Sequence, residues 1–222
     1  MASTTGPHNI TDGLVLALDA GNIKSYPGSG TSWVDLSNNG NNATLVNTPT
    51  HSDGNLTFNG STQYAQANSV TDEIISGDFT LMAMIKGSTQ DHKSILSFNT
   101  STGGNRQLWM VRHAGMGMHD GGTWYIGSTD VDNNQWHLVT ATYDYSTKGL
   151  KTYTDGVLDL DVTTTNQINV QSSDTANIGM EYDGGTATDH FNGSIPMIYI
   201  YNRVLSQEEI TQIYDSRKTR FT

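Results

Sequence analysis

Short apolar runs recur along almost the whole chain, and residues that favour turns separate them. The segment 78–87 shows the pattern most clearly, because Phe79, Leu81, Ala83 and Ile85 occupy alternate positions. Alternation is typical of a β-strand, and two methionines between these residues indicate that the second face is also covered. More than ten such runs, spaced by Gly, Asn, Asp, Ser and Pro, predict an all-β antiparallel sandwich.

One helix is expected, near the C-terminus. Ser206 and Glu209 form an S-x-x-E capping box, in which each side chain bonds a backbone N–H that the helix leaves unpaired. The apolar residues that begin at Ile210 recur at i, i+3 and i+4, as in an amphipathic helix. We predict a short helix over about 206–217 that lies on the sandwich as a lid.

No linker rich in Pro, Gly or Ser divides the chain, and no internal repeat is found. We therefore expect an N-terminal arm over residues 1–12 and one domain over residues 13–222.

Asp155-Gly156 predicts a β-hairpin, because both residues tolerate the positive φ of a two-residue turn. The apolar segment 195–201 is expected to form a long edge strand that pairs between subunits in a possible homo-oligomer.

The composition excludes several classes of function. A net charge of −11 opposes binding to a phosphate backbone, so nucleic acid is not an expected partner. The absence of cysteine excludes disulfides, thiolate nucleophiles and Cys-based zinc sites. The first residues contain no basic segment and no apolar core, so we expect no signal peptide, and no apolar run is long enough for membrane insertion.

Three segments carry a resemblance to a known family. They are "LTFNGSTQYAQ", "WHLVTATYD" followed by "LKTYTDG", and the ending "FNGSIPMIYIYNRVLSQEEI". In this order they resemble the laminin-G-like, concanavalin A-like jelly-roll domains over roughly residues 13–215. The resemblance implies a β-sandwich that ends in a short helix. Trp136, at the start of "WHLVTATYD", is expected to be a core anchor rather than a ligand platform.

The front of the chain carries a second resemblance. The segment 13–47, "GLVLALDAGNIKSYPGSGTSWVDLSNNGNNATLVN", is similar to laminin-G-like modules in structural proteins of tailed bacteriophages, especially phages of marine bacteria. It implies a non-catalytic, lectin-like protein at the virion surface, assembled in the host cytoplasm, whose partners are glycans of the host surface. Capsid or tail subunits are the alternative partners, and the chain would then be a decoration protein.

A glycoside hydrolase is the third hypothesis, because the same fold houses such enzymes. Hydrolysis requires two carboxylates at a fixed separation. Laminarinase-type enzymes of this fold carry them in the motif E-x-D-x-x-E on one strand. Here Glu181 and Asp183 match the first two positions, but the second Glu is missing. We therefore expect that the chain is not an enzyme.

Calcium is the most plausible cofactor, because sandwich loops offer the oxygen ligands that hard cations prefer. Glu181, Asp183 and Asp189 fall within one Gly-rich segment and are the predicted ligands. The competing interpretation is that these acids are solvated turn residues.

Sugar binding requires an aromatic ring that can stack on a sugar and polar groups that reach its hydroxyls. Tyr125 faces the opposite way from Trp124 in an extended strand and is expected to be the more exposed of the two. Burial in a strand is the competing interpretation for Trp109 and Trp124. The predicted ligand-binding residues are Trp109, His119, Asp120, Trp124, Tyr125 and Tyr182.

Overall fold

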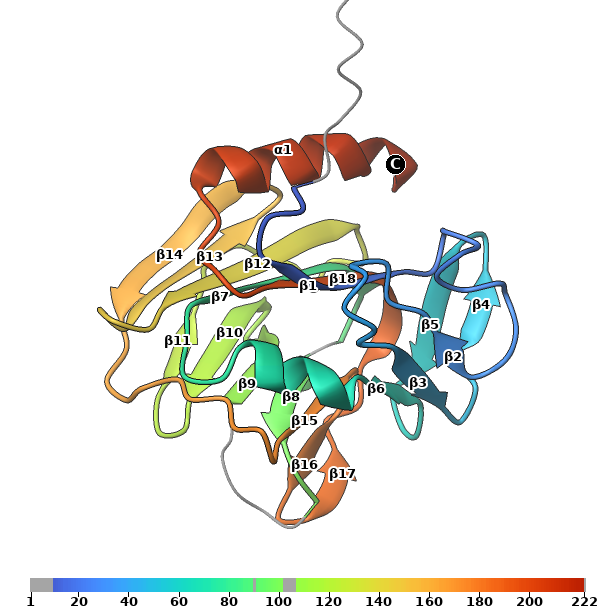
Figure 1. Ribbon diagram of the computed structural model, residues 1–222, viewed down its shortest axis with the longest axis horizontal. Helices are drawn as coiled ribbons and strands as arrows, with labels where there is room; N and C mark the ends of the chain where they lie inside the picture. Colours follow the sequence, from blue (N-terminus) through green and yellow to red (C-terminus); the bar gives the residue numbers. More distant parts are fainter. Residues whose placement is uncertain (1–9, 90, 102–106, 222) are drawn as a thin grey trace, which may run out of the picture.

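The computed structural model describes residues 10–89, 91–101 and 107–221, and these form three layers (Figure 1). Two eight-stranded antiparallel sheets face each other, and helix α1 (Gln207–Arg217) covers the outer face of one of them. We call the sheet under the helix sheet A and the other one sheet B. The predicted all-β antiparallel sandwich with a short C-terminal helix is confirmed. Most of the predicted arm, residues 1–12, lies outside the described residues.

Sheet A is built mainly from the central and C-terminal parts of the chain. Its spatial order is β14 (Val157–Thr163), β13 (Gly149–Thr154), β12 (His137–Asp144), β7 (Phe79–Gly87), β18 (Asn192–Tyr201), β5 (Asn55–Asn59) and β4 (Thr50–Ser52), and β1 (Leu14–Asp19) also pairs with β18. Asp155 and Gly156 join β13 to β14 with φ values of 53° and 80°, as the predicted two-residue turn requires.

Sheet B combines the front of the chain with its middle. Its spatial order is β11 (Trp124–Ile126), β10 (Gly115–Asp120), β9 (Gln107–Arg112), β8 (Lys93–Asn99), β15 (Thr175–Ile178), β6 (Tyr64–Gln66), β3 (Ala43–Val46) and β2 (Ser32–Trp33). The remaining elements are the hairpin of β16 (Glu181–Asp183) and β17 (Thr186–Thr188), and the short helices η1 (Asn68–Glu73) and η2 (Lys218–Arg220).

The alternation in β7 explains how the layers are held together. Leu81, Ala83 and Ile85 lie in the core between the two sheets, whereas Met82 and Met84 lie in a second core under α1. Burying a large apolar side chain contributes about 1.5–3 kcal/mol. Both faces of this strand are therefore covered, as the sequence predicts.

Strand β18 lies inside sheet A, with β7 on one side and β1 and β5 on the other. The expectation that segment 195–201 forms an edge strand is therefore wrong, because strands from the front of the chain complete its second side. The strands at the ends of the sheet A path are β14 and β4.

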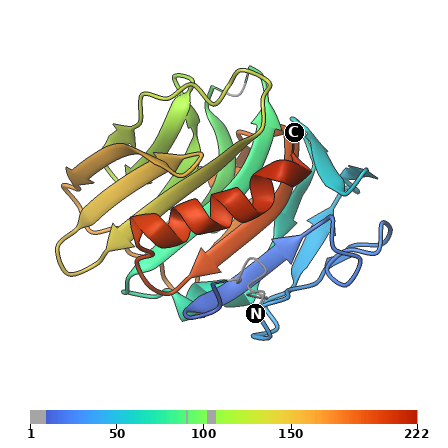
Figure 2. The ribbon, with the colours of Figure 1, turned by 90° about the horizontal axis from the view of Figure 1, so that it is seen from above.

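Helix α1 begins as the sequence predicts. The Ser206 hydroxyl accepts the Glu209 N–H at 3.3 Å, and the Glu209 carboxylate accepts the Ser206 N–H at 2.9 Å. Ile210 and Ile213 are buried against sheet A, and Figure 2 shows the helix lying over its strands. Within the described ranges, no helix combines the length and the apolar character needed to cross a membrane.

Candidate functional site

The six residues predicted to bind a ligand do not gather at one place. Trp109 lies on β9 and is only 1% exposed, in the core between the sheets. It pairs with Met118 on one side and Leu96 on the other, and these neighbours also belong to the core. Of the two interpretations of Trp109, burial in a strand is therefore the correct one, and its ring offers no face to a ligand.

Trp124 lies on the opposite, outer face of sheet B, where it is half-buried. The Arg112 guanidinium stacks over the indole, with its Cζ 4.6 Å from the ring centroid. The His119 ring lies at 4.8 Å from the indole, tilted by 40°. An indole, a guanidinium and an imidazole thus share one surface, which we call the Trp124 surface (Arg112, His119 and Trp124).

Gly117 on β10 makes this arrangement possible. A Cβ built at Gly117 would lie 3.3 Å from two carbons of the Trp124 ring and 3.2 Å from the Arg112 Cβ. The two long side chains therefore converge over a position that carries no side chain. A backbone hydrogen bond and, to a smaller extent, the positive charge of Arg112 lower the pKa of Asp91, and the guanidinium carries five N–H donors that a ligand can use. The sequence analysis did not identify Arg112, because its proximity to Trp124 depends on the pairing of three strands.

Asp120 holds loops together instead of facing solvent. It is 2% exposed, and its carboxylate accepts five hydrogen bonds, at 2.7–3.2 Å, from Gly122, Thr123, Tyr125 and Asn166. Burial raises the pKa of this carboxyl, but the hydrogen bonds outweigh that effect and the pKa lies below its ordinary value.

Tyr125 belongs to the same hydrogen-bonded group. The sequence predicts Tyr125 to be the more exposed of the two, but Tyr125 and Trp124 are both half-buried, and the Tyr125 ring packs against the core between the sheets. Its hydroxyl donates to Asp120 at 3.0 Å and accepts the Thr165 N–H at 2.5 Å. The two residues do face opposite ways, but Trp124 is the one on the outer face.

Tyr182 lies in the β16–β17 hairpin, over a different part of sheet B (Figure 1). Its backbone C=O accepts the Asn99 side-chain amide at 3.0 Å. Burial and the neighbouring Tyr182 raise the pKa of Tyr64 on β6. Strands β8, β9 and β10 separate β6 and β15 from β11 in the order of the sheet, so Tyr182 does not extend the Trp124 surface.

A polar network supports this hairpin. The Asn177 side-chain amide donates to Ser97 at 3.2 Å and to Asn99 at 3.1 Å, and the Ser97 hydroxyl donates to the Met180 C=O at 3.0 Å. These side chains are buried, so their polar groups require partners. The network fixes the backbone at Met180 and Tyr182.

The three predicted calcium ligands lie in or directly after the hairpin. Glu181 is 4% exposed, Asp183 is exposed, and the Asp189 C=O accepts the Ser94 N–H at 2.8 Å. In the part of the chain that the structure describes, no three His, Asp or Glu side chains are grouped so that they could hold a metal ion. Calcium bound here would therefore take most of its ligands from backbone carbonyls and water.

The architecture defines a lectin-like β-sandwich with a helical cover. The family model described as the concanavalin A-like lectin/glucanases superfamily matches residues 59–211. The chain belongs to this family, as its motifs indicate. A comparison with curated proteins found no match.

Similar solved structures share the fold at low sequence identity. One is domain 4 of an extracellular arabinanase from Geobacillus stearothermophilus, in complex with arabinotriose (TM-score 0.68, 15% identity, 90% of this chain and 98% of that chain). Another is the CBM40 of the IT-sialidase of Ruminococcus gnavus (TM-score 0.61, 21% identity, 72% and 96%). A third is the binding domain of botulinum neurotoxin DC (TM-score 0.70, 14% identity, 93% and 52%). The chain thus spans about half of the toxin structure.

Proposed function

We propose that the protein is a non-catalytic, lectin-like module at the virion surface of a tailed phage and that it binds glycans of the host cell. The Trp124 surface is the observation that carries this proposal. An aromatic ring binds the apolar face of a sugar, and guanidinium and imidazole groups donate to its hydroxyls. Sheet strands hold all three side chains, so binding orders few flexible groups and costs little conformational entropy.

The similar structures support a carbohydrate ligand. The arabinanase domain was solved with arabinotriose, and the sialidase CBM40 was solved bound to α2,3-sialyllactose. A further similar structure comes from botulinum neurotoxin type C, whose cell entry depends on interaction with two ganglioside molecules. Proteins of this fold therefore bind sugars in several cases. For this chain we propose the Trp124 surface as the sugar-binding surface.

A glycan array tests the proposed ligand. Wild-type protein is compared with Trp124→Ala and with Tyr145→Ala, a control in which a half-buried aromatic residue outside the Trp124 surface is removed. We expect binding to neutral glycans to fall at least tenfold in Trp124→Ala and to persist in Tyr145→Ala. Absence of binding to any glycan, with and without calcium, would overturn the proposal.

Mass spectrometry of purified phage particles tests the virion setting, for which the resemblance of residues 13–47 is the support. The alternative is a decoration protein without a glycan ligand. Light scattering and binding to empty capsid shells distinguish the two, since a decoration protein assembles on the shell even when Trp124 is replaced.

A glycoside hydrolase would release sugars from a polysaccharide panel and would lose that activity in Glu181→Gln.

Calcium stays a prediction for the β16–β17 hairpin. Asp183 lies at its tip, next to the carbonyl groups of Gly184 and Gly185, and such oxygens are suitable ligands. We expect millimolar calcium to raise Tm relative to EDTA in wild-type protein and to have no effect in Asp183→Asn. Equal melting curves of wild-type protein with calcium and with EDTA would argue against this site.

A further inference from the structure

A small pocket lies on the other side of the molecule, between α1 and sheet A. Its volume is about 90 Å³, larger than the ~10–15 Å³ needed to hold one water molecule but below the ~300–1,000 Å³ of pockets that enclose a whole ligand, so it can receive only one edge of a small ligand. It is lined by Met84, Trp136, Asp155, Tyr214, Lys218 and Phe221. These residues come from β7, the position directly before β12, the β13–β14 turn, α1, and η2 with the residue after it, so the pocket exists only in the folded chain.

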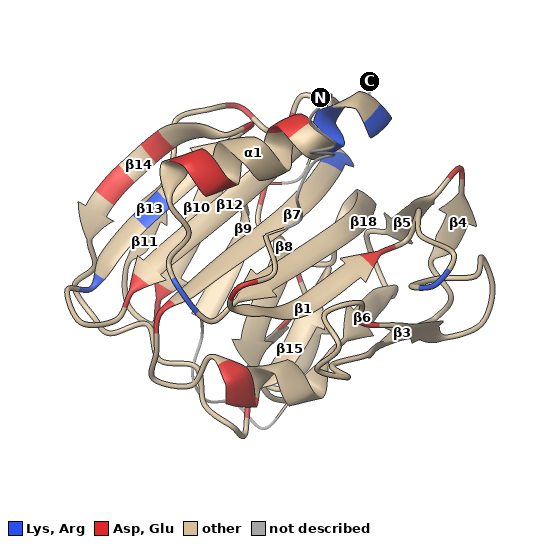
Figure 3. Cartoon of the chain, turned by 45° about the horizontal axis from the view of Figure 1, so that its top comes forward, with Lys and Arg blue, Asp and Glu red and all other residues tan. Residues whose placement is uncertain are grey.

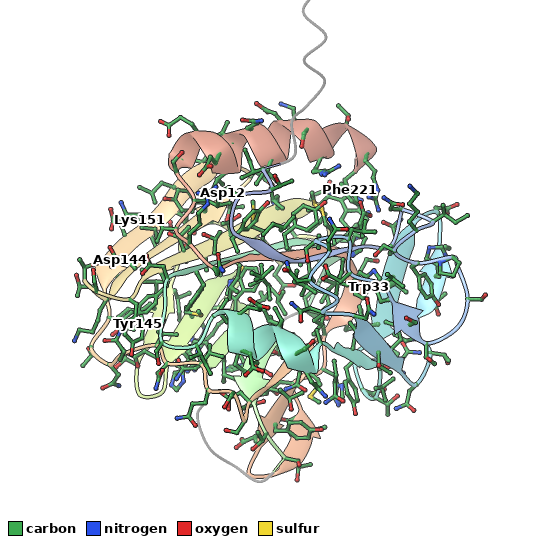
Figure 4. The ribbon with its side chains drawn as sticks, in the orientation of Figure 1. Asp12, Trp33, Asp144, Tyr145, Lys151 and Phe221 are labelled. Atoms are coloured by element: carbon green, nitrogen blue, oxygen red, sulfur yellow. The ribbon has the colours of Figure 1, made fainter. Side chains whose placement is uncertain are left out.

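Aromatic rings form much of the pocket wall. The rings of Trp136 and Phe221 lie 4.9 Å apart and are tilted by 52°, and Tyr214 lines the pocket from α1. Figure 4 shows Phe221 beneath the C-terminal end of the helix. Trp136 and Tyr214 are half-buried, so parts of both rings are accessible from solvent. The expectation that Trp136 is a core anchor is therefore only partly correct, because it borders the second core and also lines a pocket.

Two ammonium groups flank these rings. The Lys86 Nζ lies 5.7 Å from the centroid of the Trp136 ring, and the Lys218 Nζ lies 5.4 Å from that of Tyr214. Lys218 also pairs with Asp215 at 2.6 Å. Lys86 is half-buried, and among the described residues it has no carboxylate partner. The net charge of −11 opposes anion binding over the molecule as a whole, so an anion at this pocket depends on the local positive charge of Lys86, a partly buried cation that an anionic group would neutralise.

The helix terminus explains only some of this local positive charge. Figure 3 shows basic segments gathered at the C-terminal end of α1 and at the strand end beside it. Arg217, Lys218 and Arg220 stabilise the negative end of the helix dipole. Lys86 lies on β7, outside the helix, so the dipole does not account for its position.

Asp155 supplies a fixed acceptor at the same pocket. One carboxylate oxygen accepts the Leu138 N–H at 2.9 Å, and the other contacts the His137 Nδ1 at 2.8 Å. The side chain is still 29% exposed, and each carboxylate oxygen has more than one lone pair. A ligand hydroxyl can therefore donate to Asp155 while an anionic group of the same ligand lies toward Lys86.

We propose that the pocket lined by Trp136, Tyr214 and Asp155, with Lys86 at its rim, is a subsite for a carboxylated sugar residue of the uronic acid class. The sugar ring contacts the aromatic side chains, its hydroxyl donates to Asp155, and its carboxylate pairs with Lys86. This inference rests on the proposed carbohydrate-binding function but uses a different surface. The pocket lies on the outer face of sheet A, whereas Trp124 lies on the outer face of sheet B.

NMR titration of the tryptophan indole N–H resonances tests the inference. The probes are methyl glucuronide and methyl glucoside, which differ only in the carboxylate. We expect the glucuronide to shift the Trp136 resonance and the glucoside to shift it much less. Lys86→Gln is expected to weaken the glucuronide effect on the order of threefold or more, because an exposed ion pair already contributes about that much and Lys86 is half-buried. Trp124→Ala is expected to leave the effect unchanged.

The outcomes separate this subsite from the Trp124 surface. An unchanged Trp136 resonance at tens of millimolar glucuronide overturns the subsite, whatever happens at Trp124. Equal shifts with both probes also overturn it, because the carboxylate would then play no part. A shift of Trp124 alone supports the proposed function and rejects the further site. Melting curves of Lys86→Gln check that the variant is folded.

Discussion

The carboxylate of Asp159 accepts hydrogen bonds from both the backbone N–H and the hydroxyl of Ser128, each at 3.0 Å. Asp159 belongs to β14, at one end of sheet A, and Ser128 follows β11, at one end of sheet B. Thr129 donates to the same carboxylate through its N–H and its hydroxyl. One acidic side chain therefore joins the two sheets along one side of the sandwich.

Asp159→Ala should lower the free energy of unfolding by about 1–2 kcal/mol, because the donors of Ser128 and Thr129 lose their acceptor. Urea denaturation measures this change. Asp161→Ala on the same strand is the matched control: its carboxylate forms an exposed pair with Lys151 at 3.0 Å, and we expect a loss below about 0.5 kcal/mol. Equal losses in the two variants would contradict the assigned role of Asp159.

Asp120→Asn should destabilise the protein by about 1–3 kcal/mol, since an amide cannot accept all five hydrogen bonds and presents an N–H₂ group to some of the donors. The exposed Asp72 offers a control, Asp72→Asn, which is expected to have almost no effect. Urea denaturation at neutral pH compares the two variants with wild-type protein.

The same carboxyl predicts a pH dependence. Its pKa in the folded protein lies below the ordinary value, so its contribution to stability is present above the unfolded pKa, about 3.9. That contribution is lost as the pH falls through the lower, folded pKa. The difference in stability between wild-type protein and Asp120→Asn should therefore shrink below about pH 4, and a difference that grows on acidification would refute the assignment.

Ile213→Ala should cost about 2–4 kcal/mol of stability, because the side chain is buried between α1 and sheet A and its removal leaves a cavity. Ile23 is 78% exposed, and Ile23→Ala should change stability by less than about 0.5 kcal/mol. Thermal melts together with hydrogen exchange of the α1 amides check both values, and exchange should increase in the helix of Ile213→Ala only.

Gly117→Val should displace Trp124 and Arg112, since the added side chain enters the space beneath them. We expect glycan binding at the Trp124 surface to be lost while the sandwich remains folded. Gly77→Val is the control, because a Cβ there would meet its nearest neighbour at an ordinary 3.5 Å. Binding measured on the array glycans and circular dichroism of both variants give the result. Retained binding in a folded Gly117→Val would argue against this surface.

The sequence alone predicted the features that depend on local chemistry. The capping box of Ser206 and Glu209 sets the start of α1, because it involves backbone groups within one helical turn. Asp155 and Gly156 predicted the hairpin for a similar reason, since positive φ is a property of single residues. The alternation in β7 indicated two covered faces before the covering layers were known.

Only the tertiary structure decided which aromatic residues are available to a ligand. Trp109 and Trp124 lie in similar strand-like segments, but the pairing of β9, β10 and β11 directs one into the core and the other outward. The same pairing brings Arg112 over Trp124, and the docking of α1 and the C-terminus builds the pocket at Trp136. Strand register and layer packing bring together residues that are far apart in the chain. A local sequence pattern therefore cannot predict these contacts.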